Sequence, residues 1–159
     1  MWSEKFVATN RKLVITEADL EAVVSLHAKL QKRILFLIIL YTKRYGSAHL
    51  AAQRIARHTG GSTWAVQKAL SALESSGYIE KRTGHVVYSK TGFVSAANTY
   101  VYRHPVISCG GKDIEIKWDF KEDSFIETYL DTIRGHIAKD RWRELFTKKE
   151  LEELNDGQV

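Results

Sequence analysis

Hydrogen-bonding side chains recur at intervals of three and four residues between Ser62 and Ser71. If this stretch is helical, these side chains share one face. The amide of Gln67 suits adenine, to which it can form two hydrogen bonds, and the ammonium of Lys68 suits guanine or a phosphate. Hydroxyls at the start of a helix can donate to phosphate, helped by the helix N-terminus. The spacing therefore predicts a face that can bind nucleic acid, made of Ser62, Thr63, Trp64, Gln67, Lys68 and Ser71.

Trp64 is an unusual residue for an exposed polar face. Its ring can pack on a thymine methyl or a sugar. It can equally turn inward and pack beneath the strands that follow. The sequence leaves both interpretations open.

Residues 51–73 supply the elements that must position this face, and they predict two short helices joined by a tight turn. Gly60 can adopt the positive φ that such a turn often requires, and Ser62 or Thr63 can cap the second helix. The first helix carries polar side chains that can clamp a phosphate backbone, with a solvated face as the alternative: Gln53, Arg54 and Arg57. Apolar residues at helical spacing form the opposite, buried face of the second helix: Val66, Ala69, Leu70 and Leu73.

This spacing resembles the helix-turn-helix family. The matching residues are the small Ala56, Gly60 four positions later, and the apolar Val66 and Ala69. Ala56 must be small because the second helix crosses close to it. Gly61 departs from the family, which usually carries an apolar residue there, and two successive glycines make a looser turn.

The residues after the second helix resemble the wing of winged-helix proteins. Strands are predicted at 78–81, 86–88 and 99–102, with bends at Thr83-Gly84 and Thr91-Gly92. LESSGYIEKR resembles the junction between helix and wing in winged-helix regulators, and NTYVY more weakly resembles the last wing strand of plasmid and phage replication proteins. The resemblance implies wing contacts to DNA, with the strand phase left open, from Lys81, Arg82, His85, Lys90 at the tip and Arg103 at the base.

Charge is concentrated in the same part of the chain. The 159 residues carry a net charge of +5, divided as −1 over residues 1–28, +10 over 29–104 and −4 over 105–159. A basic field around a candidate recognition element attracts phosphates, and a solubilising surface is the alternative. The single cysteine, Cys109, excludes an intramolecular disulfide. Together with an N-terminus that lacks an apolar signal core, it favours a cytoplasmic, nucleoid-associated protein without a membrane span.

The other expected elements flank this unit. Residues 1–15 are expected to be irregular, and helices are expected at 17–30, 31–45, 48–58 and 63–76, with a buried strand as the alternative for 34–41. Capping boxes are predicted at Thr16–Asp19 and Thr147–Glu150. A short strand at 114–118 and a long helix, capped by Asp123 or Ser124 and extending past Trp142, precede a short helix at 147–154.

These elements predict a mainly α, α+β fold. It is a winged helix-turn-helix with N- and C-terminal helical extensions, divided into residues 1–30, 31–105 and 106–159. Apolar residues of the long C-terminal helix have near-heptad spacing. This spacing predicts either a homodimer seam or docking on the chain's own core, through Ile126, Leu130, Ile133 and Ile137.

No residue pattern indicates catalysis. The six histidines form no ligand cluster with one another or with Cys109, no phosphate-binding loop is present, and no nucleophile has a neighbouring base. We therefore expect no enzyme, metal or cofactor, and any small-molecule effector stays unknown. The expected function is sequence-specific binding of double-stranded DNA by a dimeric transcriptional regulator. The alternatives are a plasmid, phage or virus replication or partition factor, an architectural DNA binder, and a winged-helix protein-interaction module.

Overall fold

The structure is a computed structural model that describes residues 13–82, 86–89, 92–95, 98–103, 113–120 and 124–156. Residues 86–89, 92–95 and 156 are described by their backbone alone. The predictions for His85, Lys90 and Asp123 fall outside these residues. The described chain is mainly helical with small antiparallel sheets, in agreement with the predicted α+β class.

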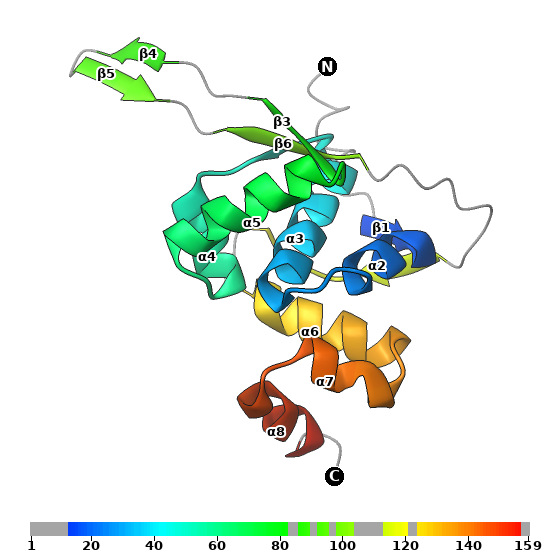
Figure 1. Ribbon diagram of the computed structural model, residues 1–159. Helices are drawn as coiled ribbons and strands as arrows, with labels where there is room; N and C mark the ends of the chain where they lie inside the picture. The colour runs from blue at the N-terminus through cyan, green and yellow to red at the C-terminus, as the bar shows by residue number, and fades with distance from the viewer. Residues whose placement is uncertain are drawn as a thin grey trace.

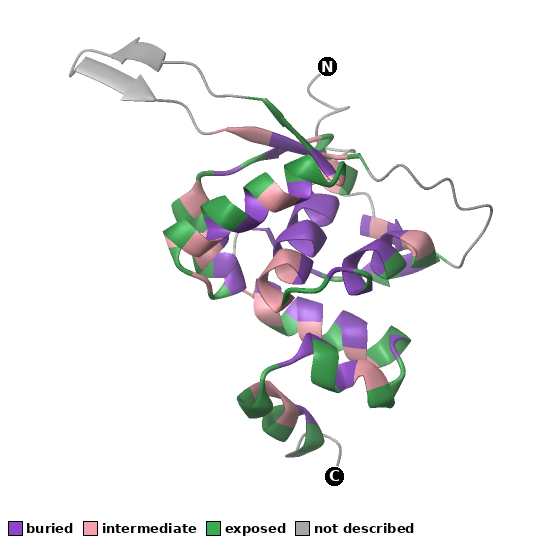
Figure 2. Ribbon diagram, viewed as in Figure 1, coloured by how far each residue is buried: buried purple, intermediate pink, exposed green. Residues whose placement is uncertain are grey.

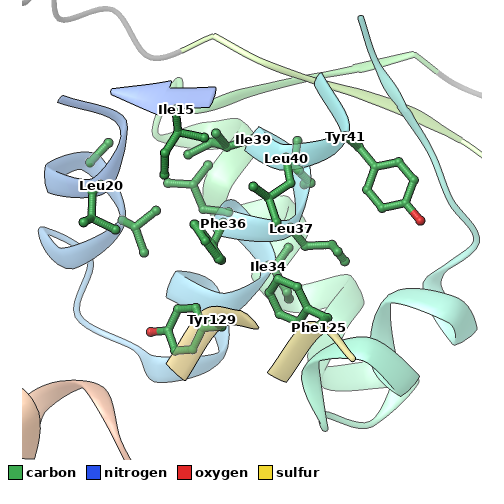
Figure 3. Packing of buried hydrophobic residues seen from close by; sticks show 14 of the residues in the cluster. Ile15, Leu20, Ile34, Phe36, Leu37, Ile39, Leu40, Tyr41, Phe125 and Tyr129 are labelled. Atoms are coloured by element: carbon green, nitrogen blue, oxygen red, sulfur yellow. The ribbon is translucent and has the colours of Figure 1, made fainter. Parts of the chain in front are cut away.

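Helix α3 (Lys29–Tyr45) lies at the centre of the molecule (Figure 1). Every residue from Ile34 to Leu40 is fully buried, so the helix is covered on all sides. Figure 3 shows its side chains packed against those of β1, α2 and α6. The prediction of a helix rather than a strand is therefore confirmed. Gly46 ends the helix with a φ of 86°, which a residue with a side chain rarely adopts.

The two helices of the predicted helix-turn-helix pack against α3. They are α4 (Ala52–Thr59) and α5 (Thr63–Ser75), and Figure 1 shows α5 crossing in front of α3. The strand β2 (Ala48–His49) precedes α4. The predicted helix 48–58 was therefore wrong at its start, because Ala48 and His49 pair instead with Tyr100 and Thr99.

The three-stranded sheet has the order β2-β6-β3, with β3 at Ile79–Arg82 and β6 at Thr99–Tyr102. Ile79 faces Tyr102 and Arg82 faces Thr99 in an antiparallel ladder. Strands β4 (Val86–Ser89) and β5 (Gly92–Ser95) form a separate antiparallel pair farther along this hairpin. The predicted strands are thus present, and β5 is an additional one.

The N-terminal elements differ from their prediction. β1 (Leu13–Thr16) is a strand instead of an irregular segment, and it pairs with β7 (Asp113–Ile116) so that Leu13 faces Ile116. Helix α2 (Glu17–Val24) has the predicted capping box, with Thr16 Oγ1 accepting from Asp19 N at 3.2 Å. It ends six residues before the expected Leu30, where the Ser25 hydroxyl donates to the Ala22 carbonyl at 2.8 Å.

The C-terminal region is broken into short helices where one long helix was predicted. They are α6 (Phe125–His136), the 3-10 turn η1 (Lys139–Arg141), α7 (Trp142–Leu145) and α8 (Lys148–Asp156). Ile137 takes an extended conformation, and its carbonyl accepts from Trp142 Nε1 at 3.1 Å instead of continuing the helix. Ser124 occupies the N-cap position of α6 but makes no capping hydrogen bond with its side chain.

This break changes the interpretation of the apolar seam. Ile133 and Ile137 are buried inside the chain itself, and Ile126 and Leu130 are half-buried against the same core. The four residues therefore do not form an exposed stripe for a second copy. Buried residues from Leu13 to Leu154 form one hydrophobic cluster, so the three predicted ranges share a single core.

Candidate nucleic-acid interface

The turn between α4 and α5 has the predicted geometry. Gly60 has a φ of 82°, and its N–H donates to the Ala56 carbonyl at 2.8 Å. Ser62 is the N-cap of α5, with its hydroxyl oxygen accepting from Ala65 N at 3.1 Å. A Cβ on Gly61 would lie 2.9 Å from a methyl of Leu30. The second glycine therefore has a packing reason: the turn before α5 passes directly over the Leu30 side chain of α3.

Helix α5 has the two faces that its sequence predicts. Val66, Ala69, Leu70 and Leu73 are buried. Thr63 is half-buried, while the remaining candidate side chains are exposed (Figure 2): Ser62, Trp64, Gln67, Lys68 and Ser71. The inward interpretation of Trp64 is wrong, because 65% of its surface is exposed.

Lys68 and Trp64 contact each other on this exposed face. The Lys68 Nζ lies 3.9 Å from the centre of the Trp64 ring. The two residues are four positions apart, which places them on adjacent turns of one helix face. An ammonium over an indole is a cation–π contact, which is attractive because the ring face is negative.

The predicted clamp on α4 is also exposed. Gln53, Arg54 and Arg57 all project from the outer surface of this helix. Ile55 and His58 of the same helix are buried, which fixes the outward direction of the other face. The two exposed arginines therefore offer guanidinium donors to a ligand.

Strand β3 divides the basic residues of the hairpin between its two sides. The Arg82 Nε and Arg103 Nε lie 3.8 and 3.1 Å from Glu80 carboxylate oxygens. Lys81 alternates with Glu80 and Arg82 along β3 and lines a groove shared with α5. Lys81 is therefore better placed than Arg82 to act together with Gln67 and Ser71.

This groove has a volume of about 390 Å³ and lies between α5, the start of α4 and the hairpin. Its polar lining includes residues outside the main sequence prediction, Glu74, Asn98 and Tyr100. Asn98 immediately precedes β6, and Tyr100 sits opposite both Ala48 and Lys81. Glu74 belongs to α5 itself, whereas Asn98 and Tyr100 come beside it through the pairing of β6, which local spacing does not predict.

A second group of charged residues lies where α3, the end of α4 and α8 meet. Arg33 donates from Nη1 to the Thr59 carbonyl at 3.3 Å and from Nη2 to the Glu150 carboxylate, and its guanidinium lies 5.8 Å from the Tyr129 ring centre. Burial opposes ionisation of Glu150, but the Thr147 N–H and Arg33 outweigh it and lower the pKa of this carboxyl below its ordinary value. The predicted capping box at Thr147–Glu150 is present, with bonds of 2.9 and 3.2 Å.

Two lysines at the start of α3 also point inward. Lys29 Nζ donates to the Phe146 carbonyl at 2.6 Å, and Lys32 Nζ donates to the Glu144 carbonyl at 3.2 Å. Burial lowers the pKa of the Lys32 ammonium below its ordinary value. These cations hold the C-terminal helices and are not part of the exposed face.

Within the described ranges, no group of three or more His, Cys, Asp or Glu side chains could hold a metal ion. None of the helices described is both long and apolar enough to cross a bilayer. Comparisons with protein-family models, with curated proteins and with solved structures each found no match.

Proposed function

We propose that this protein is a winged helix-turn-helix protein that binds double-stranded DNA and reads its sequence with α5. The observation that carries the proposal is the exposed polar face of α5, which Trp64, Gln67 and Lys68 form beside the arginines of α4. Transcriptional regulation is the use we assign first, because it is the commonest use of this fold.

The order of elements supports this assignment. A buried helix, a short strand, two helices and a two-stranded hairpin follow one another as α3, β2, α4, α5, β3 and β6. The sheet order β2-β6-β3 places the hairpin strands beside the start of α4. In a winged helix-turn-helix, this order leaves the second helix of the pair outermost, with a wing at its side.

Docking follows from dimensions and charge. The major groove is about 12 Å wide and admits one α-helix. With α5 in the groove, Ser62 at the helix N-terminus can donate its hydroxyl to a phosphate, while Gln67 reaches base edges. Arg54 and Arg57 neutralise phosphates beside the groove, and each neutralised phosphate releases counterions. Lys81 of β3 lines the protein groove beside α5 together with Gln67.

The test is selection from a pool of random DNA duplexes, followed by affinity measurements at several salt concentrations. We expect enrichment of a defined sequence and an affinity that falls as salt rises. Enrichment of an inverted repeat with half-sites about 10 base pairs apart would indicate a dimer on DNA. Salt-sensitive binding without enrichment would replace sequence reading by architectural binding, and absence of binding at low salt would refute the proposal.

A charge reversal isolates α5. We expect Lys68→Glu to abolish duplex binding while circular dichroism still reports a folded protein. Lys149→Glu is the matched control, because Lys149 is an exposed lysine of α8, which Figure 1 places at the far end of the molecule. Equal loss in both variants, or unchanged affinity of the Lys68 variant, would remove α5 from the mechanism.

A further inference from the structure

Trp64 is the more exposed of two large apolar side chains that the described residues leave on the surface, the other being Tyr45. An indole in water contributes nothing to the core, so its position needs another reason. It lies in the first turn of α5, two residues after the cap residue Ser62, on the face that carries Gln67. This is the part of the helix that enters the groove in the proposed complex.

The contact with Lys68 limits what the ring can do. With the ammonium 3.9 Å from the ring centre, one face of the indole is covered. The ring edge and the opposite face stay open to a ligand. The same contact brings the ammonium next to the ring, so the two side chains are close enough to act together on one ligand.

The two groups are about as close to each other as neighbouring base pairs are in DNA. Successive base pairs are about 3.4 Å apart along the duplex. Two groups separated by 3.9 Å can therefore face neighbouring base pairs. An apolar edge suits the C5-methyl of thymine, and an ammonium suits guanine O6 and N7, and all of these groups lie in the major groove.

We propose that Trp64 and Lys68 together read a thymine that stands next to a guanine. Trp64 buries the thymine C5-methyl against the open part of its ring, and Lys68 donates to O6 or N7 of the guanine. This proposal rests on the proposed function, since it assigns the target of the same helix face. It makes Trp64 a specificity-determining residue.

Removing the methyl without changing base pairing tests this assignment. In the duplex selected by the full chain, each thymine is replaced in turn by deoxyuridine. A buried CH₂-sized group is worth about 0.8 kcal/mol, which corresponds to about a fourfold loss of affinity. We expect that loss at one thymine for each bound copy of the protein, and a further loss when 7-deazaguanine replaces the guanine beside it.

Two variants assign the effect to this pair. Trp64→Ala should bind the thymine duplex less tightly and should no longer distinguish thymine from deoxyuridine at that position. Tyr45→Ala removes the other exposed aromatic ring and should keep the fourfold difference.

The outcomes separate this inference from the proposed function. Tight, sequence-dependent binding with no sensitive thymine would overturn the methyl contact and leave the proposed function standing. Discrimination that persists in Trp64→Ala would assign the methyl to another residue. No enriched sequence would overturn both.

Discussion

Arg33 on α3 and Arg57 on α4 are both arginines of the basic central part of the chain, but their surroundings differ. The Arg33 side chain is 12% exposed and contacts a backbone carbonyl, a carboxylate and an aromatic ring. Arg57 is exposed on the outer face of its helix. Lys32 and Lys68 repeat the contrast, since the first is buried against Glu144 and the second lies on the surface over Trp64.

This difference shows that a count of charges does not separate exposed cations from buried ones. The +10 of residues 29–104 includes cations that hold the C-terminal helices and cannot meet a ligand. The start of α3 would ordinarily repel positive charge, because a helix N-terminus is itself positive. Backbone carbonyls at the end of α7 and the Glu150 carboxylate compensate for it. The described cations of α4, α5 and the hairpin, by contrast, are exposed.

The largest expected difference between the two regions is in stability. Arg33→Ala should lower the free energy of unfolding by about 3 kcal/mol, because it leaves a largely buried carboxylate and a carbonyl without their partner. Arg57→Ala should change it by less than about 0.5 kcal/mol. Urea unfolding followed by circular dichroism measures both values. Equal losses of unfolding free energy in the two variants would contradict the distinction between a structural and an exposed arginine.

A smaller effect is expected at the other end of the same ion pair. Because the pKa of Glu150 is lowered on folding, its ionised form stabilises the protein above the ordinary pKa of 4.5, and this contribution is lost as pH falls through the folded value. Glu150→Gln should therefore be less stable than the natural sequence at pH 7, by about 1 kcal/mol. The gap should narrow below pH 4.5 in thermal unfolding at a series of pH values. A gap independent of pH would assign the loss to packing.

For DNA binding we expect the reverse order: variants of the exposed arginines should change the affinity, and a variant of the buried Arg33 should not. Arg54→Ala and Arg57→Ala should each reduce the slope of log affinity against log salt by about 1 while leaving stability unchanged. A conservative variant of the buried residue, Arg33→Lys, should leave that slope as it is. Fluorescence anisotropy with the selected duplex provides the measurement. A change of slope in the Arg33 variant would place that residue at the interface.

The smallest effect is expected at Glu80, which pairs with Arg82 and Arg103 on the exposed hairpin. Exposed pairs contribute little, so Glu80→Gln should change stability by no more than a few tenths of a kcal/mol. It should raise DNA affinity slightly, because two cations lose a competing carboxylate. Glu74→Gln, beside the groove, is the comparison. A large loss of stability in Glu80→Gln would contradict the surface assignment.

Local sequence signals were sufficient for much of the fold. The length of the segment 31–45 and the glycine that follows it predicted α3 as a helix, and the spacing of Gly60, Ser62 and Val66 predicted the turn, the cap and the buried face of α5. These features depend on neighbours within a few residues. The exposed face of α5 followed from the same periodicity.

The errors fall where a distant partner decides the conformation. Ala48 and His49 became a strand because β6 pairs with them, and Leu13–Thr16 became one because of β7. Helix α6 ends early because Trp142 satisfies the Ile137 carbonyl. The inward direction of Lys32 and Arg33 depends on helices more than 100 residues later in the sequence. None of these partners can be identified from local spacing.

The pairing of β1 with β7 also bears on how the chain folds during synthesis. Leu13 faces Ile116, so the first strand leaves the ribosome long before its partner. At about 5–20 residues per second, the roughly 100 intervening residues take about 5–20 s to make. Throughout that interval β1 has an unpaired edge, which is a template for wrong pairing with other chains. The helices α2 to α5 can form locally in the meantime, but the core is completed only after β7 and the helices that follow it have been made.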